Sequence, residues 1–124
     1  MIILDANTKK LQVVSTVADL HWTASWKAID VTCGPTCNPC FENKEAQGLT
    51  TVGTVDMIPV VTANTNTITY SNEVEYLNVH NSSMGNADIT IQIDISATPR
   101  TVFKKTLTTG QNLVYNRDGG WLIS

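Results

Sequence analysis

Ile89-Thr90-Ile91-Gln92-Ile93-Asp94-Ile95 is the stretch of this sequence that decides the fold. Every second residue is isoleucine, and the residues between the isoleucines are polar. Successive side chains of a β-strand point to opposite faces, so this segment would present one apolar face and one polar face. That pattern is typical of an antiparallel sheet that covers a core on one side and faces water on the other.

The rest of the chain repeats this pattern in other short runs. Val, Ile and Thr fill 40 of the 124 positions, and such β-branched side chains fit a sheet better than a helix. Glycine-containing turns at Thr109-Gly110 and at 116–120 predict two hairpins near the end. Further strands are predicted at 10–15, 20–31, 50–61, 67–70, 74–81, 100–107, 111–115 and 121–123.

These strands predict an all-β fold. We expect a single antiparallel β-sandwich or jelly-roll-like domain of about eight strands over residues 1–124, with 1–15 as an extended N-terminal arm or strand. Residues 32–48 are predicted to be a loop that contains all the cysteines, with Glu42–Gln47 as its only helix-like part. In the run 20–31 the apolar residues change parity, which predicts a β-bulge near Lys27–Ala28.

Charge and hydropathy argue against two classes of partner. The formal net charge is −3, and no run of basic residues is longer than two. Nucleic-acid binding through phosphate neutralisation needs clustered Lys and Arg, so we expect no nucleic acid partner. No apolar stretch reaches the ~18 residues that cross a bilayer, and Asp5 follows directly on Met1-Ile2-Ile3-Leu4. We therefore expect neither a membrane segment nor a secretory leader, and no use of the glycosylation tripeptide at Asn81.

The three cysteines form the pattern Cys33-x3-Cys37-x2-Cys40. The same spacing holds the iron–sulfur cluster of radical S-adenosylmethionine enzymes, but those need an α/β barrel of about 200 residues, which this chain lacks. A structural zinc site would need a fourth ligand, and the only histidines are His21 and His80. Oxidation is the favoured reading, because an odd cysteine left over from one internal bridge can bond to a neighbouring chain. Free thiols remain the third alternative.

Trp22 and Trp26 are predicted on one face of a single strand, roughly 13 Å apart at ~3.3 Å per residue. Paired aromatic rings at this spacing can stack on a sugar. More often they lie in a core or at a subunit interface, because each buries about 150–250 Å². We therefore take both residues as core or interface candidates and keep a carbohydrate site as the alternative.

The sequence contains no motif of a known catalytic site. It has no Gly-x-Ser-x-Gly, no His-Glu-x-x-His and no glycine-rich phosphate loop. A cysteine nucleophile paired with His21 or His80 is the one catalytic arrangement left, and nothing in the sequence marks a site that would stabilise its thiolate. We expect a protein that is not an enzyme and that uses no cofactor.

Several short motifs, taken in order, carry a resemblance to a known group of proteins. The chain contains Leu4-Asp5-Ala6-Asn7-Thr8-Lys9-Lys10-Leu11, then Trp26-Lys27-Ala28-Ile29-Asp30-Val31, Val74-Glu75-Tyr76-Leu77-Asn78-Val79, Leu107-Thr108-Thr109-Gly110-Gln111-Asn112-Leu113-Val114-Tyr115 and Gly120-Trp121. This order resembles small virion accessory proteins of tailed bacteriophages, the capsid decoration or cement proteins and neck-associated β-sandwich proteins. The cysteine segment departs from that group, which usually has Gly, Thr and Pro there.

The resemblance implies a non-enzymatic structural protein of the virion. The expected partner is the major capsid protein or another virion protein, the expected assembly is a homotrimer, and synthesis would take place in the host cytoplasm. Disulfides between subunits would be this chain's own addition. Two alternatives stay open: a neck, collar or tail-fibre component that binds a receptor or glycan through Trp22 and Trp26, and a small zinc-binding domain built on Cys33, Cys37 and Cys40.

Overall fold

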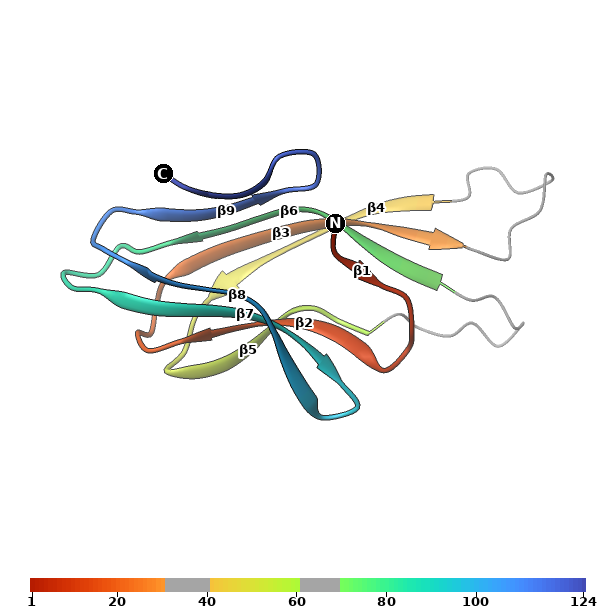
Figure 1. Cartoon of the computed structure of the whole chain (residues 1–124), viewed down its shortest axis with the longest axis horizontal. Coiled ribbons are helices and arrows are strands. Elements are labelled where there is room, and N and C mark those ends of the chain that lie inside the picture. Colours follow the sequence, from red (N-terminus) through yellow and green to blue (C-terminus); the bar gives the residue numbers. More distant parts are fainter. Residues whose placement is uncertain (31–40, 61–69) are drawn as a thin grey trace.

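A computed structural model of the chain describes residues 1–30, 41–60 and 70–124. These residues form an all-β fold of two antiparallel sheets packed face to face, a β-sandwich, as predicted (Figure 1). The strands are β1 (Ile3–Leu4), β2 (Lys9–Ser15), β3 (His21–Asp30), β4 (Phe41–Leu49), β5 (Gly53–Ile58), β6 (Tyr70–His80), β7 (Ala87–Ile95), β8 (Thr98–Leu107), β9 (Asn112–Asn116) and β10 (Gly120–Ile123). The described part of the chain thus has ten strands rather than about eight.

The four-stranded sheet, sheet B, contains the isoleucine strand β7 as one of its two inner strands. Its order is β5-β2-β7-β8, and β7 pairs with β2 from Ile95 opposite Lys9 to Ile89 opposite Ser15. Ile89 and Ile91 are fully buried, and Ile93 is partly buried against the same core. The alternating pattern therefore has the predicted structural outcome, with one face of β7 on the core.

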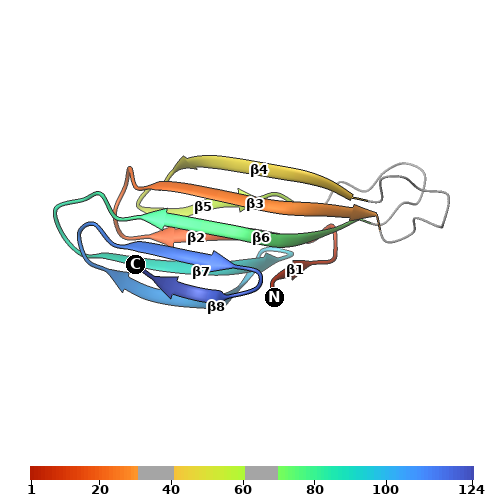
Figure 2. The ribbon, with the colours of Figure 1, turned by 90° about the horizontal axis from the view of Figure 1, so that it is seen from above.

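The second sheet, sheet A, lies over the first in the order β10-β9-β6-β3-β4 (Figure 2). The short strand β1 also belongs to it and pairs with β6. β6 is thus paired along both sides, with β3 on one side and with β9 and β1 on the other. The N-terminal residues 1–15 are built into the chain's own sandwich, because β1 lies in sheet A and β2 lies inside sheet B.

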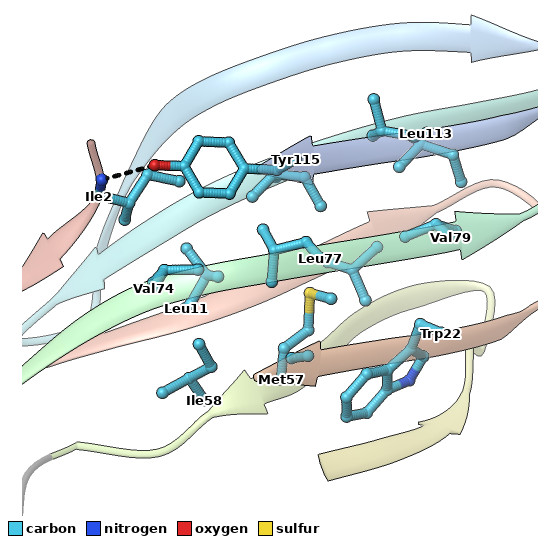
Figure 3. Close-up of a cluster of buried hydrophobic side chains, with 14 of the residues drawn as sticks. Ile2, Leu11, Trp22, Met57, Ile58, Val74, Leu77, Val79, Leu113 and Tyr115 are labelled. Carbon is cyan, nitrogen blue, oxygen red and sulfur yellow. Dashed lines mark hydrogen bonds between the residues drawn. The ribbon is translucent and has the colours of Figure 1, made fainter. Parts of the chain in front are cut away.

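Side chains from both sheets meet in one hydrophobic core (Figure 3). Tyr115 is buried among them, and its hydroxyl accepts a hydrogen bond from the backbone N–H of Ile2 at 3.0 Å. This bond satisfies a polar group inside the core and fixes the N-terminal segment against β9. The largest fully buried side chains are Leu4, Leu11, Leu20, Met57, Ile58, Leu77, Ile89, Ile91, Leu107 and Leu113.

The predicted loop at 32–48 is wrong in its second part. Residues 41–49 form β4, which pairs with β3 from Phe41 opposite Ile29 to Leu49 opposite His21. The helix-like stretch Glu42–Gln47 is consequently extended. Six residues of good helix formers are too few to hold a helix in water, and the free backbone groups of β3 offer them a complete ladder of hydrogen bonds instead.

The predicted β-bulge near Lys27–Ala28 lies elsewhere. The register between β3 and β6 shifts between Ser25 and Trp26, which face Tyr76 and Val74, so Glu75 is the extra residue. The bulge therefore belongs to β6. It moves the buried positions of β6 from Val74 to Leu77 and leaves Glu75 on the outer surface of the sheet.

Of the two predicted C-terminal hairpins, only the second forms. β9 and β10 pair across the turn that ends at Gly120. β8 pairs with β7 in sheet B and β9 pairs with β6 in sheet A, so the connection through Gly110 crosses from one sheet to the other. Both glycines have positive φ, 84° and 73°, a backbone conformation that other residues rarely adopt. Throughout the described ranges we find no helix with the length and apolar character that a bilayer crossing requires.

Candidate functional site

Trp22 and Trp26 lie in the core and not on the surface. Both are on the inner face of β3, with 5% and 7% of their surface exposed. Trp22 also covers Gly48 of β4, where an added Cβ would lie 2.9 Å from Cζ2 of the indole. Both rings therefore belong to the core, one of the roles predicted for them, while the interface and carbohydrate roles stay predictions.

The cysteines lie outside the described residues, so the zinc and disulfide hypotheses for Cys33, Cys37 and Cys40 stay predictions. Asp30 and Phe41, which flank that segment in the sequence, lie at one end of the β3–β4 pair. His21 and His80 lie at the other end, since Trp22 pairs with Val79. His80 Nδ1 is 3.0 Å from Asn112 Oδ1. Within the described ranges, no three His, Cys, Asp or Glu residues lie close enough to hold a metal ion.

The outer face of sheet A carries an ionic cluster around the bulge of β6. Arg117 forms ion pairs with Glu73 and with Glu75, the latter at 3.0 Å between Nη1 and Oε1. Lys27 Nζ lies 3.7 Å from the same Glu75 oxygen and 4.9 Å from the centre of the Phe41 ring. The hydrogen bond to Glu75 raises the pKa of the already basic Arg117. The cluster fixes the turn after β9 onto β6, where Arg117 N–H also donates to the Glu75 carbonyl.

Glu73 is the buried member of this cluster. Its Oε1 is enclosed and has no aligned hydrogen-bond donor, although Arg117 Nη2 is within ion-pair distance of it. A buried carboxylate that keeps its charge depends on a counter-ion, because removal of the partner leaves its desolvation uncompensated.

We therefore expect Arg117→Gln to lower the midpoint of urea unfolding, and Glu73→Gln in the same chain to restore part of the loss. The restoration arises because the second change removes the buried charge that the first leaves without a partner. A double-mutant cycle measured by urea titration tests this expectation. Strictly additive losses would mean that Glu73 does not depend on Arg117.

Next to the cluster, the outer face of sheet A is hollowed into an open groove of about 380 Å³. It is lined by Trp26 and by Ser25, Asn43, Lys44, Glu45 and Glu75, which supply hydroxyl, amide, ammonium and carboxylate groups. It contains no histidine or cysteine, and no hydrogen bond that would activate Ser25 as a nucleophile was found among the described residues. The groove thus brings hydrogen-bonding and charged groups together on one open surface.

Asn81 has a structural role that the sequence did not predict. The side chain is completely buried at the end of β6. Its Nδ2 donates to the carbonyls of Gly85 and Leu107, both at 2.9 Å, and its Oδ1 accepts from Ser83 N–H and Ser83 Oγ. The amide of the apparent glycosylation tripeptide is therefore fully engaged inside the protein. The Asn-x-Ser pattern was the available signal, and it indicates a loop that closes on its own asparagine.

Comparisons with protein-family models, with curated protein sequences and with solved structures gave no significant match. A function for this chain is therefore inferred from its own residues and from their resemblance to the motifs described above.

Proposed function

We propose that this chain is a non-enzymatic structural protein of a tailed-bacteriophage virion, a capsid decoration protein that binds the lattice of the major capsid protein as a homotrimer and stabilises the shell. The observation that carries the proposal is the order of the motifs that resemble such proteins, which extends over nearly the whole chain from Leu4 to Trp121.

The places of these motifs in the fold support the proposal. Leu4, Leu11, Leu107, Leu113 and Tyr115 are motif residues, and all five are buried in the core. The motif glycines, Gly110 and Gly120, have positive φ, Gly110 in the connection from β8 to β9 and Gly120 in the hairpin of β9 and β10. The resembling residues are thus those that specify the sandwich, which favours a shared fold with the phage proteins. The function follows from that fold only by analogy.

The surface of the sandwich also suits a binding role. On the outer face of sheet B, side chains form a ladder of hydrogen bonds in which Gln92 donates to Gln12 at 2.8 Å and Gln12 donates to Asp56 at 2.8 Å. Only 15% of the residues are charged, against about 25% in typical soluble domains. Flat sheet faces with amide and hydroxyl groups favour broad, hydrogen-bonded contacts over the enclosure of a small substrate.

Two other readings have less support. A glycan-binding tail or neck component would need exposed aromatic rings, and Trp22 and Trp26 are not exposed. A zinc-binding domain rests on cysteines that lie outside the described residues. A neck or collar position without glycan binding remains a proposal of the same class, and copy number separates it from a shell position.

The deciding experiment is quantitative mass spectrometry of purified virions from a phage that encodes this chain. We expect a copy number comparable to that of the major capsid protein, and recombinant protein should bind shells from which it is missing. A copy number far below that of the shell protein would assign the chain to the neck or tail. Its absence from the particle would overturn the proposal. Non-reducing electrophoresis of the same particles tests the disulfides between subunits, which a monomer band alone would exclude.

A further inference from the structure

The free cations of the chain are concentrated on one edge of the sandwich. Of the eight Lys and Arg residues, five form ion pairs. The other three, Arg100, Lys104 and Lys105, form no ion pair with any described residue, and all three lie exposed on β8. β8 contains no acidic residue, so it carries a charge of +3 while the rest of the chain carries −6.

The acidic edge of the molecule is β4. In contrast to the basic β8, this edge strand carries the exposed Glu42 and Glu45, and its Lys44 is already paired to Glu42 at 3.1 Å. Exposed apolar side chains lie at its two ends and just after it: Phe41 is 46% exposed, Leu49 54% and Val52 73%. The other two edge strands differ from it, since β10 has no charged residue and Asp56 of β5 is engaged by Lys10 and Gln12.

These two edges lie on opposite sides of the sandwich. β4 borders sheet A on the side where that sheet lies over β5, with which it makes contact. β8 borders sheet B on the other side, where Phe103 stacks on Trp121 of β10 with ring centres 4.4 Å apart. Figure 2 shows β4 and β8 at the two opposite borders of the molecule. Each strand is paired on one side only, so each leaves alternate backbone N–H and C=O groups free.

From this arrangement we propose that copies of this chain associate head to tail, with the basic β8 edge of one copy against the acidic β4 edge of the next. The partner that fits β8 is thus a second copy of this chain. A twofold dimer pairs the same surface of both copies, so it cannot bring together two edges that lie on opposite sides of the molecule. The contact is therefore heterologous, and it repeats until the copies close into a ring or continue as a filament. On the β4 side the contact would cover the exposed Phe41, Leu49 and Val52.

A different role for these charges makes a contrasting prediction. Lysine on an edge strand often prevents sheet-to-sheet aggregation, and Lys105 shares the inward parity of Ile89, as such protective charges do. Protective charges keep a protein monomeric, and their removal promotes association. Complementary docking charges hold copies together, and their reversal separates them. The two roles therefore predict opposite changes in mass.

The test begins with the full-length wild-type protein, measured by sedimentation velocity over a range of concentrations and salt. We expect an oligomer at low salt that dissociates as salt rises, because the Debye length falls from about 10 Å at 0.1 M to about 3 Å at 1 M ionic strength. A protein that is monomeric at every concentration and salt would overturn the inference. This outcome would leave the proposed role on the shell standing if the monomer still binds shells, but it would contradict a homotrimer that forms in solution.

Charge reversal then identifies the two edges. Lys104→Glu with Lys105→Glu, and separately Glu42→Lys with Glu45→Lys, should each raise the dissociation constant by about tenfold or more. The chain with all four reversals should recover the wild-type association, because attraction is restored with the signs exchanged. Asp118→Lys, an exposed charge reversal in the turn between β9 and β10, is the control and should leave the mass unchanged.

Two results would count against the inference at this stage. One is an oligomer whose dissociation constant is unchanged by either pair of reversals. The other is a variant with all four reversals that stays monomeric although circular dichroism shows that it is folded. Hydrogen exchange of the wild-type protein adds a measurement that needs no variant. Backbone amides of β4 and β8 should gain protection together as the concentration rises, and protection that does not depend on concentration would contradict the contact.

Discussion

Replacement of Asn81 by alanine is expected to lower the free energy of unfolding by about 3 kcal/mol or more, because it leaves several buried polar groups without partners at once. The carbonyls of Gly85 and Leu107 lose their donor, and Ser83 loses its acceptor. The backbone N–H and C=O of Asn81 also bond to Gln111 and Gly110, and these two bonds remain possible in the variant. The side chain thus ties the loop between β6 and β7 to the end of β8.

Urea titration followed by circular dichroism measures this loss as a shift of the midpoint at unchanged slope. Asn86→Ala is the matched control, because Asn86 lies exposed close to Asn81 and should change stability by no more than about 0.5 kcal/mol. Asn81→Asp should also destabilise, since a carboxylate keeps the acceptor but faces the two carbonyls without a donor. An Asn81→Ala protein as stable as the control would mean that the loop does not depend on this side chain.

Replacement of Trp22 by alanine is expected to cost about 3–5 kcal/mol, the range for removal of a large aromatic side chain from a core. Trp22 packs on the inner face of β3 and covers Gly48 on the neighbouring strand, so its removal opens a cavity between the edge strand and the core. Such a loss is a large share of the roughly 5–15 kcal/mol that stabilises a domain. Leu122→Ala, at an exposed position, is the control and should have little effect.

The packing of Trp22 against Gly48 can also be tested by a change at the glycine. Gly48→Ala alone should destabilise the protein by about 1–3 kcal/mol, because the new methyl group would lie too close to the indole. In a Trp22→Leu background the same change should cost less, since the smaller side chain leaves room for the methyl group. Equal costs in the two backgrounds would show that the ring and Gly48 do not constrain each other.

The alternation in 89–95 was enough to predict a strand of an antiparallel sheet and the face that it buries. Such a prediction depends only on the period of two along one segment, and Ile89 and Ile91 are indeed fully buried. The turns at Gly110 and Gly120 were predictable for a similar reason, because a positive φ strongly favours glycine. That the chain passes from one sheet to the other at Gly110, where a hairpin was predicted, was not predictable from the turn residues. These are local properties that a short stretch of chain carries by itself.

The failures of prediction all depend on neighbours in space. Glu42–Gln47 has helix formers, yet β3 lies beside it and turns it into a strand. The bulge was assigned to β3 from the parity of Ile29, although the extra residue is Glu75 on β6. A change of parity in one strand does not tell which of two paired strands has the additional residue.

The candidate functional residues also divide into those that local sequence predicts and those that only the structure brings together. The composition predicted a weakly charged β protein without a catalytic motif, and the motif order predicted a virion role that stays a proposal. Only the structure placed Trp22 and Trp26 in the core, where little of either ring is exposed. It also brought Glu73, Glu75 and Arg117 together, although Arg117 is more than forty residues away from both in the sequence.

The sequence by itself thus determined the fold class, the central strand and the turns, because period and glycine placement act over a few residues. The tertiary structure decided which strands lie at the edges, which charges remain without a partner and which polar side chains are buried. Strand order sets these properties: β4 and β8 are edges only because of the pairings β3–β4 and β7–β8 at the borders of the two sheets. No pattern within either strand specifies its place in the sheet.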